Sequence, residues 1–424
     1  MENLDYLILG CGVWGLSTAW WIIKDQPDAK ILCLDKWEVP SLDSAGYDIN
    51  KVISAKYGSD LDNYTSLLAF EAWENPIFKS VYHKTGMLGV ADDNPEALEY
   101  VTKAYNKRVK NNYGEDVEWC ENIQSLVRRF PLLKDSNISG WKGYFDALGG
   151  WVHASKAMKI IYEDCLKKGV EFKFGDSGTV SGLEIHEGKL VSVKCEDGSL
   201  QVAPKIIMCL GAYTELFLDM NKQTTAKCWS LVHLKVSPEE ARSMRNGPIL
   251  FNFQRGFFFE PDENLCVKVV NEFPGFTNYE KVADGRTISV PRSNGMHPNE
   301  TIPDKCRDSI RDFLKRAVPF LADREFVYEK LCWCSDSNDK RWIISRHPQF
   351  KNLTVATGDS GLGFKMLPII GKFIKDVSNG TSLPEVVGDY WSWKNQESSA
   401  STKIERWGLD NVTEDLKSQS GWRT

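Results

Sequence analysis

The chain has 424 residues, a formal net charge of −6 and 11 cysteines. This mild acidity offers no basic surface for nucleic acid or for an anionic membrane, and no apolar run reaches the roughly 18 residues that a membrane span requires. The chain opens with MENLDYLILG, which is not a secretory signal. We therefore expect a cytoplasmic protein whose scattered thiols are reduced, long enough for two domains.

The first predicted unit is a strand at 4–9, a helix at 13–25 and a second strand at 31–36. The turn between the first strand and the helix carries Gly10, Gly12 and Gly15, which lets a backbone approach a pyrophosphate at the helix N-terminus. Asp35 ends the second strand, where a carboxylate can accept hydrogen bonds from ribose hydroxyls. The pattern predicts a dinucleotide site but fits NAD and FAD alike. A glycine-rich turn in an ordinary α/β protein is the alternative.

The remaining elements alternate between two kinds of structure. We expect, in chain order, a helix at 153–169, strands at 170–174 and 183–202, a buried strand at 205–213, a hairpin at 256–270, and a strand, glycine loop and helix over 353–374. The predicted fold class is α/β with an α+β second lobe. A Rossmann-like nucleotide-binding domain is expected from residues 1–84, 151–219 and 326–395, a sheet-rich substrate domain from 85–150 and 220–325, and a polar tail over the surface from 396–424.

Five segments identify a family resemblance. They are LILGCGVWGLSTA, SAGYDINKVISAKYG (44–58), IIMCLGAYTE (206–215), VKVVNEFPGF (267–276), and LCWCSDSNDKRWIISRHP (331–348) running on to GDSGLGFKMLPIIGK (358–372). Together they resemble the glycine/D-amino-acid-oxidase type of flavoprotein, and within it the branch of monomeric sarcosine oxidase and the fungal fructosyl amino acid oxidases (amadoriases). The resemblance extends to about residue 394 and implies FAD rather than NAD. It places FAD contacts at Gly10, Gly12, Val13, Trp14, Gly15, Asp35, Lys36, Ser44, Lys51, Val170, Gly211, Asp359, Gly361, Gly363, Phe364 and Lys365.

Cys332 falls where this branch attaches its flavin covalently, through a thioether at the isoalloxazine 8-methyl group. The attachment needs a thiol near the ring edge, with a neighbouring charge or dipole that favours the thiolate. A buried structural thiol is one alternative, and half of a Cys332/Cys334 metal pair is another. A C-x-C with no second pair or histidine cluster is a poor zinc site, so we expect no metal.

Lys268 and Glu272 are spaced as a helical ion pair would be, but the surrounding valines favour a strand. The resemblance places this lysine over the flavin ring, where a cation stabilises superoxide. In the fructosyl oxidases the glutamate touches the substrate, whereas sarcosine oxidase has a histidine there. Lys51 matches an active-site lysine of the fructosyl oxidases, where sarcosine oxidase has an arginine. Its alternative is a solvated loop lysine.

Lys365 matches a lysine that binds the substrate carboxylate in the resembling oxidases. Its alternative is an exposed lysine at a helix start, where a cation opposes the helix dipole. Gly361 and Gly363 would let the loop backbone and the helix N-terminus meet the flavin's pyrimidine carbonyl. The GDSG at 358–361 also resembles the nucleophile segment of chymotrypsin-like proteases, but no matching histidine segment is present.

Two departures bear on the substrate. Fructosyl oxidases carry two arginines near the C-terminus where this chain has Ser392 and Lys394, and Ser54 replaces a further arginine. Serine cannot form the bidentate contact that a guanidinium makes with a carboxylate, and lysine is only a point charge. Lys394 is therefore retained as a candidate for the substrate carboxylate.

The resemblance implies oxidation of a C–N bond in a small secondary amine, with O2 as acceptor and H2O2 as product, by a monomer. Three hypotheses remain open. The first is a fructosyl amino acid oxidase, favoured by Lys51, Lys268 and Glu272 together. The second is an oxidase of saccharopine, pipecolate, sarcosine or an N-methyl amino acid. The third is a flavin-binding module that has lost turnover.

Overall fold

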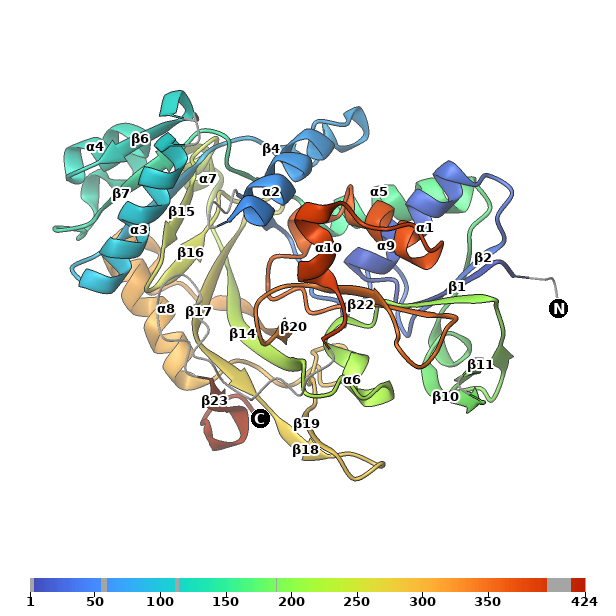
Figure 1. The fold of residues 1–424 in the computed structure, drawn as a ribbon. Helices are drawn as coiled ribbons and strands as arrows, with labels where there is room; N and C mark the ends of the chain where they lie inside the picture. Colours follow the sequence, from blue (N-terminus) through green and yellow to red (C-terminus); the bar gives the residue numbers. More distant parts are fainter. Residues whose placement is uncertain (1–3, 55–58, 111–113, 188, 395–412, 424) are drawn as a thin grey trace.

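Two large sheets and the helices that cover them form the fold (Figure 1). The structure is a computed structural model that describes residues 4–54, 59–110, 114–187, 189–394 and 413–423, apart from the side chains of 272–274. This architecture is the α/β class with a second, sheet-rich lobe that the sequence predicts.

The first sheet has the strand order β21-β22-β13-β1-β2-β9. Its strands are β1 (Tyr6–Leu9), β2 (Ile31–Leu34), β9 (Glu171–Lys173), β13 (Lys205–Met208), β21 (Ile343–Arg346) and β22 (Leu353–Thr357). Neighbours are parallel from β22 to β9, and β21 is antiparallel at the edge. Side chains alternate between the faces, so Ile8 packs on one side of the sheet and Leu7 and Leu9 on the other. The predicted β-α-β unit is confirmed.

Helices cover one face of this sheet and a small sheet covers the other (Figure 1). The helices are α1 (Val13–Asp25), α5 (Ala154–Lys167) and α9 (Ile370–Ser378), and the small sheet comprises β10 (Val180–His186), β11 (Lys189–Cys195) and β12 (Leu200–Gln201). In α5 the buried residues Ala157, Ile161 and Cys165 recur at helical spacing, which orients this helix on the sheet. The predicted helices at 13–25 and 153–169 and the alternating strands at 183–202 are thereby confirmed.

The second sheet has the strand order β20-β14-β17-β16-β15-β5-β7-β6, with β23 beside β17. Its strands are β5 (Met87–Ala91), β6 (Val117–Cys120), β7 (Lys142–Asp146), β14 (Thr224–Lys235), β15 (Ile249–Asn252), β16 (Gly256–Phe258), β17 (Cys266–Thr277), β20 (Phe326–Ser337) and β23 (Glu414–Asp415). In β17, Val267 and Val269 face the core that contains α8 (Asp304–Ala317), while Lys268 and Val270 face the opposite side. The predicted hairpin at 256–270 is confirmed as β16 and β17.

A third, smaller sheet has the order β3-β8-β4, from β3 (Lys51–Ile53), β8 (Gly150–Val152) and β4 (Tyr82–His83). The other described elements are α2 (Asp60–Trp73), α3 (Pro95–Arg108), α4 (Ile123–Arg129), α6 (Thr214–Phe217), α7 (Pro238–Met244), α10 (Glu385–Trp391), β18 (Tyr279–Lys281) and β19 (Thr287–Ser289). The domain boundaries stay a prediction. One strand departs from them, because β20, which the sequence assigns to the first domain, pairs with β14 in the second sheet.

The last residues of the chain do more than lie over the surface. Residues 413–423 return to the second sheet, where β23 runs parallel to the end of β17. Leu416 and Trp422 are buried in the same apolar core as α8. These two apolar side chains anchor a stretch that its polar composition predicts to be a surface tail, whereas residues 396–412 of that tail lie outside the described part. None of the described helices has both the length and the apolar character that crossing a membrane requires.

Candidate functional site

A cavity of about 500 Å³ lies between the carboxyl ends of the first sheet and one face of the second. In open α/β sheets, ligands bind in the crevice at the carboxyl ends of the strands. Predicted site residues that line this cavity are Gly10, Gly12, Val13, Trp14, Asp35, Lys36, Ser44, Lys51, Gly211, Lys268, Cys332, Asp359, Gly361, Gly363, Phe364 and Lys365. The structure thus brings residues from both ends of the chain to one place.

The three glycines of the first turn have different structural reasons. Gly10 has a φ of +95°, and a Cβ there would lie 2.6 Å from the carbonyl oxygen of Cys209. A Cβ on Gly15 would lie 1.8 Å from the Gly10 carbonyl oxygen, so Gly15 is needed for the helix to pack on the strand. A Cβ on Gly12 would approach the Ser44 hydroxyl to 3.2 Å, at the cavity wall. Gly12 therefore leaves this part of the cavity open, and its contact with a pyrophosphate stays a prediction.

Asp35 lines the cavity beside this turn, at the end of β2. Its carboxylate accepts hydrogen bonds from the Cys11 N–H at 2.7 Å, the Trp37 N–H at 3.0 Å and the Ser41 hydroxyl at 2.8 Å. Burial raises the pKa of Asp35, while these three donors oppose that shift. A carboxylate has about four acceptor positions, so capacity remains for a ribose hydroxyl. That role of Asp35 stays a prediction.

A buried carboxylate links two predicted lysines at the other end of the cavity. Lys51 Nζ lies 2.8 Å from Asp48 Oδ2, and Lys268 donates to the same oxygen and, at 2.8 Å, to the Asn50 carbonyl. His233 of β14 pairs with Lys268 of β17, and its Nε2 lies 3.8 Å from the other Asp48 oxygen. The side chains of Asp48 and Lys268 are each only 2% exposed. The sequence thus folds two ammonium groups onto one carboxylate.

The pKa values of this cluster follow from burial and from that imbalance of charge. Burial opposes ionisation of Asp48, but the ammonium groups of Lys268 and Lys51 hold its pKa well below the usual range. Burial lowers the pKa of Lys268 to about 8, aided by the charge of Lys51 and opposed by Asp48. The carboxylate of Asp48 outweighs burial at Lys51, whose pKa is raised. Lys268 is therefore the first of the two lysines to lose its proton as pH rises.

Cys332 completes this wall of the cavity. Its sulfur lies 3.9 Å from Lys51 Nζ, and its strand position is opposite Trp229 in β14. The Lys51 ammonium donates a hydrogen bond to this sulfur. Cys334, two residues further along β20, is buried and also lines the cavity.

The alternative in which Cys332 and Cys334 bind a metal would need further ligands beside them. Among the described residues, the group of three metal-type side chains is His153, Asp262 and Glu263, which includes neither cysteine. Asp262 accepts hydrogen bonds from its own turn, and Glu263 lies 2.5 Å from Lys156 Nζ. Internal partners thus account for both carboxylates of this group, and the expected absence of a metal stays a prediction.

The glycine loop after β22 differs from its prediction in one respect. Gly361 and Gly363 line the cavity, but the residues after them form a single 3-10 turn, Phe364–Met366, and α9 begins only at Ile370. The prediction that a helix starts directly after the loop is therefore wrong, and Lys365 is not at the N-terminus of an α-helix. Lys365 is buried, lines the cavity and donates to the Ser66 hydroxyl at 3.2 Å.

Three predicted site residues are not among the described residues that line the cavity, and the side chain of a fourth is not described. Gly15 acts in helix packing, and Val170 is buried in the core beside α5. Lys394 donates to the carbonyls of Asp389 at 3.3 Å and Tyr390 at 3.2 Å, at the end of α10, and is not among the described residues that line the cavity. Glu272 belongs to β17, but its side chain lies outside the described residues.

Sequence reasoning missed Asp48 and an aromatic wall. Asp48 lies within the segment that carries the resemblance, three residues before Lys51, and this spacing was the available indication. The aromatic wall consists of Trp229, Phe251, Phe257 and Phe259. Within GFFFEP, the alternation of a strand places Phe257 and Phe259 on one face and Phe258 on the other, which could have been predicted.

Known proteins resemble this chain over nearly its whole length. L-saccharopine oxidase of Schizosaccharomyces pombe is 29% identical over 422 residues, covering 94% of each chain. Human peroxisomal sarcosine oxidase is 24% identical and covers 88% of this chain and 92% of its own. Among solved structures, a thermally stable mutant of fructosyl peptide oxidase superposes with a TM-score of 0.93 at 32% identity and full coverage of both chains. Amadoriase II of Aspergillus fumigatus gives 0.87 at 31% identity, covering 100% of this chain and 98% of its own.

A family model described as FAD dependent oxidoreductase matches residues 5–377. The match spans the glycine turn, the strand that carries Lys268 and the strand that carries Cys332. A nucleotide turn that opens into a cavity and a cationic wall opposite agree with a bound flavin. The chain therefore belongs to the FAD dependent oxidoreductase family.

Proposed function

We propose that this chain is an FAD-dependent amine oxidase that cleaves the C–N bond of a secondary amino acid, with O2 as acceptor and H2O2 as product. The observation that carries this proposal is the cluster of Lys51, Asp48 and Lys268 beside the Cys332 thiol, in the cavity that the nucleotide turn opens into. A buried cationic wall suits both anionic substrates and the superoxide formed when O2 is reduced.

The described residues fit FAD. The Gly10 and Gly12 turn and Ser44 would hold the pyrophosphate, and Asp35 would hold a ribose. FAD, when bound, supplies the hydride acceptor and the electrons that reduce O2. We also propose that Cys332 would hold the flavin through a thioether to its 8-methyl carbon, because its sulfur lines the cavity and accepts a hydrogen bond from Lys51 at 3.9 Å. A C–H bond of that methyl group and the S–H bond would break with loss of their protons, and the two electrons would pass to the flavin and from there to O2.

The lysines have separate tasks in this proposal. Lys268 has a pKa of about 8, so it carries a proton at neutral pH and presents a positive charge to O2 as negative charge develops there. Asp48 fixes the position of this ammonium, and the Asn50 carbonyl accepts a second hydrogen bond from it. Lys365, which lines the same cavity, is the candidate for the substrate carboxylate.

A fructosyl amino acid is the first candidate substrate. The superposable structures are fructosyl peptide oxidases and amadoriases, and the sequence resemblance matches Lys51 to an active-site lysine of that branch. The aromatic wall of Trp229, Phe251, Phe257 and Phe259 lines the same cavity as Lys51 and Lys268 and offers apolar surface to a substrate. The predicted contact of Glu272 with the substrate remains part of this proposal.

Saccharopine is the second candidate, on a specific observation. Lys394 caps α10 and Ser392 donates to the Asp389 carbonyl at 2.8 Å, so neither stands in for the arginines of the fructosyl branch. Four of the described lysines line the cavity, and three of them, Lys51, Lys268 and Lys365, lie beyond the nucleotide turn, which suits a substrate with several carboxylates. The relative with 29% identity is named L-saccharopine oxidase.

The test is anaerobic reduction of the flavin absorbance by fructosyl-valine, fructosyl-lysine, saccharopine, pipecolate and sarcosine in turn, followed by admission of O2 and measurement of H2O2. Bleaching by a fructosyl amine supports the first candidate, and bleaching by saccharopine alone supports the second. A protein that holds flavin but is bleached by none of the five amines would contradict the proposed oxidase and support a binding module.

A further inference from the structure

The segment 290–297, here called the bridging loop, closes part of the cavity that the described residues form. It connects β19 to the turn before α8, and Val290, Pro291 and Met296 line the cavity. The Ser293 hydroxyl donates to Asp43, which also lines the cavity. A Cβ on Gly295 would lie 2.3 Å from an Asp43 oxygen, so the loop is tightly packed against residues beyond β2. The bridging loop therefore covers the Asp35 end, where the fold places the nucleotide part of FAD.

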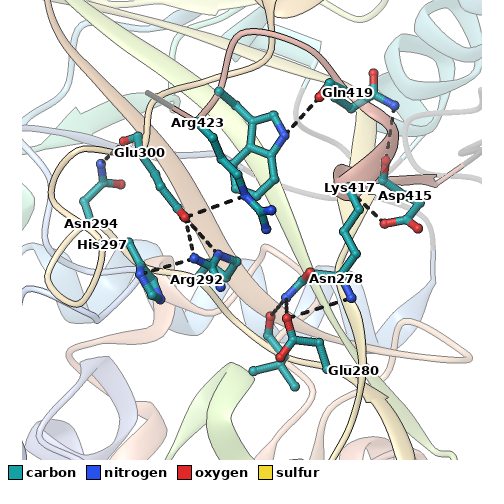
Figure 2. Close-up of polar contacts among 12 residues, drawn as sticks. Asn278, Glu280, Arg292, Asn294, His297, Glu300, Asp415, Lys417, Gln419 and Arg423 are labelled. Atoms are coloured by element: carbon teal, nitrogen blue, oxygen red, sulfur yellow. Dashed lines mark hydrogen bonds and ion pairs between the residues drawn. The ribbon is translucent and has the colours of Figure 1, made fainter.

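The last residues of the chain hold this loop from the other side. Residues 413–423, here called the C-terminal strap, include Trp422, whose carbonyl accepts a hydrogen bond from the Thr301 N–H at 2.8 Å. The Arg292 guanidinium lies 6.0 Å from the Trp422 ring and forms an ion pair with Glu300. Figure 2 shows Glu300 between Arg292 of the loop and Arg423 of the strap. Strap and loop thus share one cluster of charged and aromatic side chains.

One residue of the loop also connects this cluster to the site wall. The Arg292 carbonyl accepts a hydrogen bond from the Trp333 indole at 2.7 Å, and Trp333 follows Cys332 in β20. Arg292 therefore touches the strap through its side chain and the cavity wall through its backbone. A displacement of Trp422 would remove the aromatic surface against which this arginine lies.

The strap itself is anchored away from the loop. Glu414 pairs with Phe276 of β17 and with Lys305 of α8. Lys417 Nζ donates to the Tyr279 carbonyl at 2.6 Å and also lies 3.9 Å from Glu280, a contact visible in Figure 2. Leu416 is fully buried. The strap can therefore act as a fixed support rather than as a segment that follows the loop.

We propose that Trp422 and Arg292 are positioning residues that hold the bridging loop over the nucleotide end of the cavity and so slow the release of FAD that has not yet formed the proposed bond to Cys332. The proposal rests on the FAD that the family binds and does not depend on which amine is oxidised. Without Trp422, the loop would keep its contact to Asp43 but lose its outer support, so opening would need less free energy. Loss of the contact with Trp422 is expected to shift the opening equilibrium of the bridging loop by about tenfold.

The release rate of FAD tests this proposal. The Cys332→Ser background removes any covalent bond, and FAD release is followed by the rise of flavin fluorescence after dilution. We expect release to be about tenfold faster with Trp422→Ala, with Trp422→Phe keeping most of the retention. Trp141→Ala is the matched control, because Trp141 is buried in the same core and stacks on Phe313. Equal release rates for Trp422→Ala and Trp141→Ala would overturn the proposal.

Amide hydrogen exchange gives a second readout in the wild-type background, which retains its native cysteine. Glu300→Gln keeps the shape of the side chain but removes the charge that holds Arg292. We expect faster exchange across 290–297 and unchanged exchange across β1. Unchanged protection of 290–297 in both Glu300→Gln and Trp422→Ala would contradict the support that the strap is proposed to give. Loss of amine oxidation with normal FAD retention would instead concern only the proposed function.

Discussion

The Lys51 ammonium lies 3.9 Å from the Cys332 sulfur, although 281 positions separate the two residues in the sequence. Lys51 comes from β3 of the small third sheet, and Cys332 from β20 at the edge of the second sheet. The contact brings an ammonium group to the thiol that we propose as the point of flavin attachment.

Covalent attachment of the flavin is the first consequence to test. Cys332→Ser should leave the acid-precipitated protein colourless, whereas the wild-type pellet stays yellow. Lys51→Met should slow the incorporation of flavin into apoprotein, since it removes the ammonium group that donates to the Cys332 sulfur. Cys334→Ser is the control. A yellow pellet from Cys332→Ser together with a colourless one from Cys334→Ser would assign the bond to Cys334 and contradict the prediction.

Asp48→Asn should be strongly destabilising. It leaves the ammonium groups of Lys51 and Lys268 without their shared carboxylate, and removing one partner of a buried ion pair costs about 3–5 kcal/mol. The free energy of unfolding is measured by denaturant titration of the apoprotein. Adding Lys268→Met should recover part of the loss, because only one buried cation then remains. Additive losses in the double variant would show that the cluster is not coupled.

The reaction of reduced enzyme with O2 should fall as pH rises through about 8, the pKa to which burial lowers Lys268. Below that pH the lysine is protonated and stabilises superoxide, and above it the charge is lost. Stopped-flow reoxidation of the flavin across this range measures the rate. Lys268→Met should react slowly at every pH and lose this inflection, and an unchanged inflection in the variant would assign it to another group.

Two lysines predicted to bind the substrate carboxylate should behave differently. Lys365 lines the cavity, so Lys365→Met should raise KM by about tenfold or more, as expected when a charged contact of about 1.5–3 kcal/mol is lost. Lys394 donates to carbonyls at the end of α10, so Lys394→Met should leave KM unchanged. Steady-state assays with the substrate identified by flavin bleaching make the comparison, and a KM effect from Lys394→Met alone would reverse the assignment.

The glycine turn separates a folding role from a binding role. Gly15→Ala should lower the thermal unfolding temperature, because its Cβ would lie 1.8 Å from the Gly10 carbonyl oxygen. Gly12→Ala should fold normally, since the nearest atom is a side-chain oxygen at 3.2 Å, but should bind FAD weakly. Melting curves and FAD titrations of both apoproteins test this pair. Equal unfolding temperatures with a loss of FAD affinity in Gly15→Ala would contradict the distinction.

Local patterns predicted the first sheet well. The strand, turn and helix at 6–25 follow from a short apolar run, three glycines and helical spacing, all within one stretch of chain. The site residues of this part could be identified for the same reason. Cys332 and Lys268, in contrast, carry no local indication of function and depended on the resemblance to known oxidases.

Long-range pairing accounts for what the sequence missed. Nothing local places β23 beside β17, or makes Trp422 part of the core around α8, because both depend on residues more than one hundred positions away. Asp48 is a single polar residue in a loop without a periodic pattern, so its spacing from Lys51 was the one local indication, and its contact with Lys268 depends on the fold. The prediction of a helix directly after Gly363 was wrong because Phe364–Met366 form a 3-10 turn. The α-helix starts at Ile370, six residues after Phe364.

The cluster of Asp48, Lys51, Lys268 and Cys332 forms only when separate sheets come together. Asp48 and Lys51 belong to the third sheet and its approach, Lys268 and Cys332 to two strands of the second, and the nucleotide turn to the first. A nascent chain that has completed only one sheet therefore contains an ordinary thiol and ordinary lysines. The Cys332 thiol gains its contact with the Lys51 ammonium only when the second and third sheets have docked. Under the proposed attachment, we therefore expect a chain that stalls before this docking not to become bonded to a flavin.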